Sequence, residues 1–353
     1  MTKYRIAVIA GDGIGREVMP EGLRALAAAG AVFGFDIEVR AFDWSCETFK
    51  ATGKMMPDDG LDRLREHDAV LLGAVGFPGV PDHISLWGLL IPIRRGFDQY
   101  VNLRPVRLLR GVQSPLRDAR PGDIDMWIVR ENSEGEYSQI GGRLFEGTPQ
   151  ESVTQVSTFT RRGTDRIITY AFDLARRLSR GRVSSATKSN GLFHSMPFWD
   201  ERFTEIAAKY PEIASDLQHV DIMAARMVMQ PKKFDVVVAS NLFGDILSDL
   251  GPGVTGTIAM APSANINPER VHPSLFEPVH GSAPDIAGKG LANPIGMIWS
   301  VAMMLDHLGQ PDASAAIIRA IEEALADEGA PRTPDLAGRA TTSDVGAAIA
   351  ARI

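Results

Sequence analysis

The first third of the chain alternates between apolar, strand-like runs and amphipathic helical stretches. An apolar run at residues 4–10 predicts a buried strand, and the Ala- and Leu-rich stretch after it predicts a helix that ends near Gly30. Further strands are predicted at 35–41 and 68–73, with helical stretches between them. This alternation is typical of an α/β fold with a largely parallel sheet.

The middle of the chain departs from this alternation. Strand-like runs at 125–130 and 153–159 flank a polar, Gly- and Glu-rich segment at 134–147. That segment is too polar for a core, so we interpret it as an arm or hairpin that packs on another subunit. Helices and strands are then predicted at 164–179, 182–187, 198–209, 218–221 and 234–239. From about Asn293 the chain is predicted to be mainly helical, with a break at 329–331.

Composition and charge narrow the class of protein. Hydrophobic residues make up 44% of the chain and charged residues 23%, which is ordinary globular composition. The net charge of −7 argues against a nucleic-acid partner, because phosphate binding needs a concentrated basic surface. The one cysteine, Cys46, allows no intrachain disulfide and fits a reducing compartment. Neither a signal-peptide layout nor an apolar stretch approaching roughly 20 residues is present, so we expect a cytoplasmic protein without a membrane partner.

The glycines after the first strand invite a dinucleotide-binding interpretation, with Asp36 or Glu38 as the ribose ligand. The spacing Gly11-x-Gly13-x-Gly15 has one residue between its second and third glycines, whereas the Rossmann fingerprint requires two. We therefore interpret these glycines as a tight strand-to-helix turn beside a cleft.

The segment 241–249 carries a candidate metal site. It follows the apolar strand 235–239, and on a helix Asn241, Asp245 and Asp249 lie on one face. Two stacked carboxylates repel each other unless a cation intervenes, and a hard divalent ion such as Mg²⁺ prefers such oxygen ligands. A solvated helix face is the alternative, and the sequence leaves both open.

Three arginines and two further side chains are candidates for substrate chemistry. Arg104 ends one strand-like run and Arg130 another, and with Arg94 they suggest a dicarboxylate bound bidentately by guanidinium groups. Taken singly, each arginine is more consistent with a surface position or a structural ion pair than with a ligand site. Tyr137 and Lys188 are candidates for proton transfer, since a lysine near a metal ion and arginines has its ammonium form disfavoured.

The segment 277–288 contains two glycines, two prolines and small polar residues, which predicts an ordered loop whose backbone approaches a ligand closely. An acidic residue in such a loop, here Asp285, can bind the two hydroxyls of a ribose. It would also repel a 2′-phosphate, which favours NAD over NADP.

Together these motifs resemble the β-decarboxylating dehydrogenases, the family of isopropylmalate, isocitrate, homoisocitrate, tartrate and D-malate dehydrogenases. The resemblance covers nearly the whole chain. It rests on the motifs at residues 9–15, 102–105, 130–135, 241–249, 277–288, 332–336 and 340–342. The combination of the aspartate helix with the His-Gly-Ser-Ala-Pro loop is highly specific.

The resemblance implies an isopropylmalate-dehydrogenase-like, two-domain α/β fold with a mostly parallel large sheet, not a Rossmann dinucleotide fold. The large domain would comprise residues 1–104 and 260–353. The smaller central domain would comprise residues 105–259, with the dimer interface and an arm at about 134–158.

The resemblance also implies a role for each candidate residue. The substrate carboxylates would be bound by Arg94, Arg104 and Arg130. Tyr137 would protonate the enolate carbon after decarboxylation, and Lys188 would accept the hydroxyl proton. Mg²⁺ or Mn²⁺ would be bound by Asp221, Asp245 and Asp249. The adenosine part of NAD would be bound by His280, Gly281, Ser282, Ala283, Asp285 and Asn293. In the family Lys188 and Asp221 come from the second subunit, so a homodimer with shared active sites is implied, as is a monovalent cation such as K⁺.

Substrate choice is predicted from the segment before Arg94. Isopropylmalate dehydrogenases usually carry a glutamate where Leu86 stands, and this segment is one residue longer than theirs. We expect Leu86 and Trp87 to contact the substrate. The segments 42–48 and 55–58 look like those of tartrate and D-malate dehydrogenases.

The sequence therefore favours NAD-dependent oxidation and oxidative decarboxylation of C4 2-hydroxy dicarboxylates. One alternative is a 3-isopropylmalate dehydrogenase. A more remote one is a non-catalytic regulatory subunit, although such subunits tend to lose the tyrosine or lysine that are present here as Tyr137 and Lys188.

Overall fold

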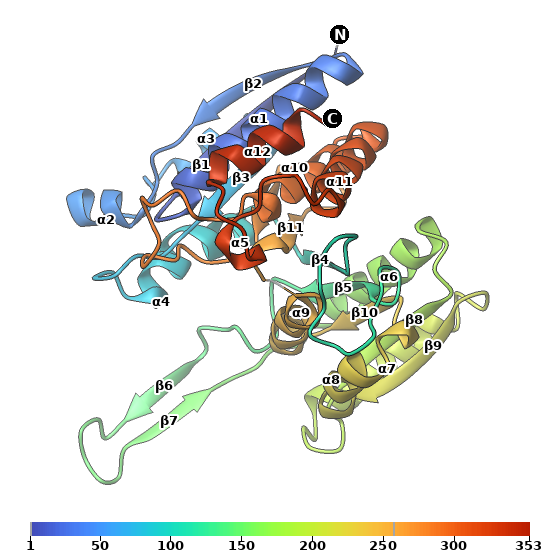
Figure 1. The fold of residues 1–353 in the computed structure, drawn as a ribbon. Helices are drawn as coiled ribbons and strands as arrows, with labels where there is room; N and C mark the ends of the chain where they lie inside the picture. The colour runs from blue at the N-terminus through green and yellow to red at the C-terminus, as the bar shows by residue number, and fades with distance from the viewer. Residues whose placement is uncertain (1, 257) are drawn as a thin grey trace. The chain divides into compact units, whose positions relative to one another are not determined.

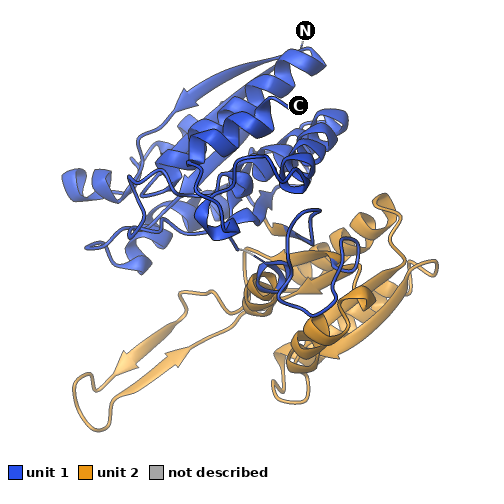
Figure 2. Cartoon of the chain, in the orientation of Figure 1, with its two compact units in different colours: residues 1–99, 104–124, 251–353 blue, residues 100–103, 125–250 orange. Residues whose placement is uncertain are grey.

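The computed structural model describes residues 2–256 and 258–353. The chain forms two compact units (Figure 2). Unit 1 comprises Met1–Gln99, Arg104–Ile124 and Gly251–Ile353, and unit 2 comprises Tyr100–Leu103 and Asp125–Leu250. Both units combine strands and helices, as predicted. No helix within the described residues is long and apolar enough to cross a membrane.

The sheet of unit 1 has the strand order β2-β1-β3-β12-β11. These strands are β2 (Phe35–Ala41), β1 (Thr2–Gly11), β3 (Ala69–Ala74), β12 (Ser274–Pro278) and β11 (Pro262–Ile266). Neighbouring strands are parallel except for β11, which runs antiparallel to β12. The first three strands match the prediction, whereas β11 and β12 were not predicted.

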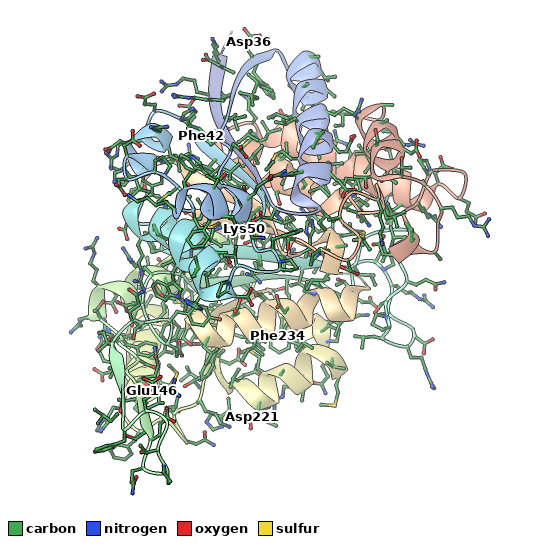
Figure 3. All side chains as sticks on the ribbon, turned by 90° about the vertical axis from the view of Figure 1, so that its left-hand side faces the viewer. Asp36, Phe42, Lys50, Glu146, Asp221 and Phe234 are labelled. Atoms are coloured by element: carbon green, nitrogen blue, oxygen red, sulfur yellow. The ribbon has the colours of Figure 1, made fainter. Side chains whose placement is uncertain are left out.

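Helices cover both faces of this sheet. One group packs together around α1 (Figure 1) and consists of α1 (Gly15–Phe33), α10 (Ile295–His307), α11 (Pro311–Ala326) and α12 (Thr342–Ala350). The opposite face carries α2 (Cys46–Thr52), α3 (Gly60–Arg65), α4 (Asp82–Ser85), the π-helical turn η1 (Leu86–Leu90) and α5 (Ile91–Gly96). Ala7 and Ile9 of β1 alternate in direction with Ile6 and Val8 and face a core that includes Phe42 (Figure 3).

Unit 2 has a parallel sheet with the strand order β5-β10-β8-β9. Its strands are β5 (Asp125–Glu131), β10 (Val236–Ala239), β8 (Arg182–Thr187) and β9 (Ala214–His219), and its helices include α6 (Arg161–Arg177), α7 (Ser195–Ala207) and α8 (Val220–Met229). Phe172 of α6 stacks on Tyr210 at 4.9 Å between ring centroids and packs against Phe203 of α7 at 5.6 Å. These rings fill the apolar layer between the two helices.

Two elements carry the chain between the units. They are β4 (Val101–Arg107) and α9 (Asn241–Thr255), and α9 starts two residues after β10 ends, as the sequence predicted. The prediction that Arg104 ends a strand is wrong, because β4 continues through Pro105 to Arg107. Proline lacks an N–H but keeps an extended backbone, so it can stand inside a strand where its missing donor is tolerated.

The polar middle segment forms a hairpin of β6 (Gly141–Leu144) and β7 (Ser152–Gln155), which are antiparallel. It extends away from the rest of unit 2, with Glu146 in the connection between its strands (Figures 1 and 3). The predicted strand at 153–159 is shorter than expected, since β7 ends at Gln155. Apolar side chains of the hairpin are exposed, with 63% of Leu144, 66% of Phe145 and 70% of Val153 accessible. Such a surface is typical of a segment that packs on a partner.

Candidate functional site

A cavity of about 530 Å³ in unit 1 gathers many of the predicted residues. Its walls include the C-terminal end of β3, the helical segment from α4 to α5 and the residues that follow β12. The predicted residues among its lining are Leu86, Trp87, Arg94, Arg104, His280 and Gly281. Strand ends of an α/β sheet are where such proteins place ligand sites.

Arg94 is buried at this cavity together with a carboxylate that the sequence analysis did not single out. Its Nη2 donates to Glu277 Oε1 at 3.0 Å, and Asn265 Nδ2 donates to the same oxygen at 2.7 Å. The Arg94 side chain is 7% exposed, and its Nε has no hydrogen-bond partner among residues 2–256 and 258–353. A buried guanidinium with an unused donor at a cavity wall has capacity for an anionic ligand.

The segment before Arg94 forms a π-helical turn, η1, between α4 and α5. A π-turn contains one residue more than a regular helical turn, so it can accommodate the additional residue that the sequence analysis expects in this segment. Met55 lies against the turn, because a Cβ added at Gly88 would stand 2.7 Å from Met55 Cγ. Trp87 lies under Arg95, whose guanidinium carbon is 4.9 Å from the ring centroid.

The His280 loop is supported by the first turn of α1. Ile14 N–H donates to the Ser282 carbonyl at 2.9 Å, and a Cβ at Gly13 would lie 2.0 Å from that oxygen. The Glu17 carboxylate accepts the N–H groups of Gly288 at 2.6 Å and Gly290 at 2.8 Å. The early glycine turn thus supports the loop at a distance of about 270 residues along the chain.

His280 itself is buried, and burial lowers the pKa of its imidazole, so the ring is neutral at physiological pH. Its Nδ1 lies 3.0 Å from the Gly281 carbonyl, while its Nε2 has no hydrogen-bond partner within the described part of the chain. A buried ring nitrogen of this kind fits a ligand that donates or accepts a hydrogen bond there.

The other predicted NAD residues differ in their surroundings. Asn293 is buried and fully engaged, because its Nδ2 donates to Asp335 at 2.9 Å and its Oδ1 accepts from Ile295 N–H at 3.0 Å. Asp285, by contrast, is exposed. Asp335 belongs to the Arg-Thr-Pro-Asp-Leu motif at 332–336, which gives that motif a structural role beside the loop.

In unit 2 a second group of predicted residues surrounds the first turns of α9. Arg130, 2% exposed, donates through Nη2 to Asn241 Oδ1 at 2.7 Å and through Nη1 to Asp245 Oδ1. Tyr137 O–H donates to the other oxygen of Asp245 at 2.6 Å, and its ring centroid is 5.3 Å from the Arg130 guanidinium. Gly244 makes this approach possible, since a Cβ there would lie 2.6 Å from the Arg130 side chain.

Asp245 and Asp249 lie one turn apart on α9, as the sequence predicted. Two carboxylates at this spacing are hard oxygen donors that fit a divalent cation. Among residues 2–256 and 258–353, however, no three His, Cys, Asp or Glu side chains of one chain are grouped to hold a metal ion. Asp221 instead stands at the start of α8 (Figure 3), where it pairs with Lys188 Nζ at 2.9 Å. That ammonium holds the pKa of Asp221 below its usual range.

Several residues of these two groups lie outside the sequence prediction. Glu277 and Met55 lay within segments that the sequence analysis singled out, but without a role of their own, and Glu17 and Asn265 carried no sequence signal. Glu277 meets Arg94 and Glu17 meets Gly288 across more than 180 residues of chain, so no local pattern could have identified these contacts.

The fold and these groups of residues are typical of an α/β oxidoreductase. A family model described as isocitrate/isopropylmalate dehydrogenase matches residues 5–349. The chain therefore belongs to the isocitrate/isopropylmalate dehydrogenase family, which confirms the predicted family and fold class.

Individual relatives narrow the comparison. The chain is 61% identical to a D-malate dehydrogenase (decarboxylating) of Escherichia coli (strain K12), over 99% of this chain and 98% of that protein. It is 58% identical to a tartrate dehydrogenase/decarboxylase of Pseudomonas putida, over 98% and 96% of the two chains. The crystal structure of isocitrate dehydrogenase from Methylococcus capsulatus superposes with a TM-score of 0.89 at 36% identity, covering 99% of each chain.

Proposed function

We propose that this protein catalyses the NAD-dependent oxidation and oxidative decarboxylation of C4 2-hydroxy dicarboxylates, D-malate and tartrate, assisted by Mn²⁺ or Mg²⁺ and K⁺. The observation that carries the proposal is the unit 1 cavity, where Arg94 and His280 each present a buried polar atom that has no hydrogen-bond partner among the described residues. The identity of 61% and 58% to relatives named for these two substrates supports the choice of substrate.

Within the cavity, Arg94 and Arg104 would bind carboxylate groups of the substrate, and Leu86 and Trp87 would limit the size of its third substituent. Cationic groups in a buried wall bind carboxylates strongly because little water competes. In unit 2, Arg130 would supply a further guanidinium for the substrate.

When bound, NAD would accept the hydride, and a divalent cation held by Asp245 and Asp249 would stabilise negative charge on substrate oxygens. Lys188 would accept the proton of the substrate hydroxyl as the C2–H electron pair leaves. Breaking the bond to the β-carboxylate releases CO₂ and leaves the electron pair on the enolate. Tyr137 O–H would then give its proton to the enolate carbon.

The functional assembly we propose is a homodimer with shared active sites. The exposed apolar residues of the hairpin supply contact area, and Lys188 and Asp221 would complete the site of the partner subunit. This would bring a third carboxylate to Asp245 and Asp249, since no third acidic side chain of the same chain is grouped with them among the described residues.

Specificity for NAD is assigned to Asp285, whose negative charge would repel a 2′-phosphate. Asp285→Lys is expected to weaken the use of NAD and improve that of NADP relative to it. The ratio of kcat/KM for the two cofactors measures this, and an unchanged ratio would contradict the assignment.

A substrate panel tests the proposal directly. NADH formation and CO₂ release are measured with D-malate, tartrate and 3-isopropylmalate, each with Mn²⁺ and with or without K⁺. We expect turnover of the C4 acids. A preference of about 100-fold or more for 3-isopropylmalate, roughly 2.7 kcal/mol of transition-state discrimination, would overturn the choice of substrate.

A further inference from the structure

Glu136 lies directly before Tyr137 and bonds to the beginning of α9. Its Oε1 accepts from Ser240 O–H at 2.8 Å, and its Oε2 accepts from Leu242 N–H at 3.1 Å. The first N–H groups of a helix lack intrahelical partners and carry the positive end of the helix dipole, so a carboxylate is well placed there. Glu136 thus attaches the segment around Tyr137 to α9.

A second contact holds the same segment to the same turn. Asn241 Nδ2 donates to the Glu134 carbonyl at 3.2 Å, while Arg130 donates to the oxygen of the Asn241 amide. On its other side the segment is held by the Glu134 carboxylate, which accepts from Thr160 N–H and O–H, both at 2.8 Å.

The hydrogen bond from Tyr137 to Asp245, unlike the contacts of Glu136, has to break during the proposed reaction. Under the proposed function Asp245 is a metal ligand and Tyr137 is a proton donor to the substrate, so neither group can remain committed to the other during the reaction. The contacts of Glu136 involve neither the proposed ligands nor the reacting atoms. They can therefore persist while Tyr137 acts.

We propose that Glu136 is a positioning residue for Tyr137: by binding the N-terminus of α9 it fixes the Tyr137 hydroxyl relative to Asp245. This rests on the proposed function. Displacing a proton donor by about 1 Å can reduce a rate by roughly 100-fold, so the effect belongs to the proton-transfer step.

The experiment compares Glu136→Ala with Glu136→Gln in the full-length dimer, with D-malate, NAD and Mn²⁺. For Glu136→Ala we expect kcat to fall roughly 10- to 100-fold, with the KM for NAD and for D-malate within about twofold of the wild type. Glu136→Gln should recover most of kcat, because the amide oxygen still accepts a hydrogen bond from α9. Asp344→Ala is the matched control, since Asp344 caps α12 in unit 1 through Thr341. It should leave kcat unchanged.

A double variant separates positioning from a general loss of stability. If Glu136 acts through Tyr137, Glu136→Ala should cause no further loss of kcat in a Tyr137→Phe background. If the losses of kcat in the two single variants multiply in the double variant, the proposal is overturned. A wild-type kcat in Glu136→Ala would also overturn it, as would a kcat in Glu136→Gln as low as that of Glu136→Ala. A Tyr137→Phe enzyme as active as the wild type would also overturn it, without affecting the dehydrogenase assignment.

If Glu136→Ala fails to fold, Ser240→Ala can replace it, because this variant removes one donor to the same carboxylate. Ser240→Ala should likewise cause no further loss of kcat in a Tyr137→Phe background. Wild-type protein that forms no NADH from D-malate or tartrate would overturn the proposed function itself, and the role of Glu136 with it.

Discussion

Gly13 contacts the backbone of the His280 loop, which is the proposed NAD-binding loop. Its φ is +52° and its missing Cβ leaves room for the Ser282 carbonyl, which a Cβ would approach to 2.0 Å. The oxygen belongs to the backbone, so relief of the clash requires movement of the loop.

We therefore predict that Gly13→Ala raises the KM for NAD strongly and lowers stability. Gly34→Ala is the control, because Gly34 has a φ of +74° and no atom of the described residues lies within 4 Å of an added Cβ. Both substitutions incur the left-handed strain of roughly 1–2 kcal/mol. An equal effect of the two on the KM for NAD would contradict the proposed support of the loop by Gly13.

His280 makes stability depend on pH with a definite sign. Burial lowers the pKa of the folded imidazole, whereas the unfolded one titrates near its ordinary value of about 6.5. As the pH falls through that value, the unfolded chain takes up a proton that the folded chain resists, so stability is lost towards acid pH.

Urea unfolding at pH 7.5, 6.5 and 5.5 measures this effect. The loss of stability on acidification should be smaller in His280→Gln than in the wild type, and unaltered in His194→Gln, since His194 is exposed. Parallel pH dependences of the wild type and His280→Gln would show that another group is responsible.

At the scale of elements, the π-turn η1 connects the segments 42–48 and 55–58 to the cavity. Met55, Phe42 and Trp44 belong to one buried cluster with Leu89, beneath the turn that presents Leu86 and Trp87 to the cavity. The segments 42–48 and 55–58 thus support the wall that the substrate would contact. The packing beneath the turn sets the position of the turn, which gives these segments a structural role at the cavity.

This packing predicts that Gly88→Ala changes substrate use rather than cofactor use. The added Cβ would stand 2.7 Å from Met55 Cγ, and overpacking of this kind costs about 1–3 kcal/mol or shifts the turn. We expect a lower kcat/KM for D-malate with an unchanged KM for NAD. Gly88→Ala combined with Met55→Ala should recover part of the loss, and absence of any recovery would count against the contact.

The elements also show where sequence patterns were insufficient. β11 and β12 have the sequences Pro-Ser-Ala-Asn-Ile and Ser-Leu-Phe-Glu-Pro, which are short and do not alternate cleanly between apolar and polar residues. Their extended conformation depends on pairing with each other and, for β12, with β3. By contrast, β2 and β8 match their predicted bounds, because their flanking turns and β-branched residues act locally.

At the scale of the whole molecule, a shared site predicts complementation between inactive subunits. Lys188→Ala and Tyr137→Phe proteins are each expected to be nearly inactive. In a heterodimer one site would combine the intact Tyr137 of one subunit with the intact Lys188 of the other. Random reassortment of equal amounts should then restore about one quarter of wild-type activity, since half of the dimers are mixed and half of their sites intact.

The recovery is measured as NADH formation after the two variants are mixed, with heterodimers verified by differential tagging. Mixing two preparations of Lys188→Ala is the control and should restore nothing. Verified heterodimers without recovered activity would contradict shared sites, while leaving the chemistry assigned to each residue in place.

The sequence by itself determined the α/β class, the family and the aspartate helix, because each depends on local periodicity or on a motif of neighbouring residues. It placed Asp245 and Asp249 one turn apart, directly after a buried strand. Only the tertiary structure decided which remote groups meet: Glu277 with Arg94, Glu17 with the glycines at 288 and 290, and Glu136 with α9. Such pairs depend on how the elements pack, and a side chain's partner across a fold leaves no mark in its immediate sequence. For this reason the early glycine turn, which has the wrong spacing for a dinucleotide fingerprint, acquired its role only in three dimensions, as the support of the His280 loop.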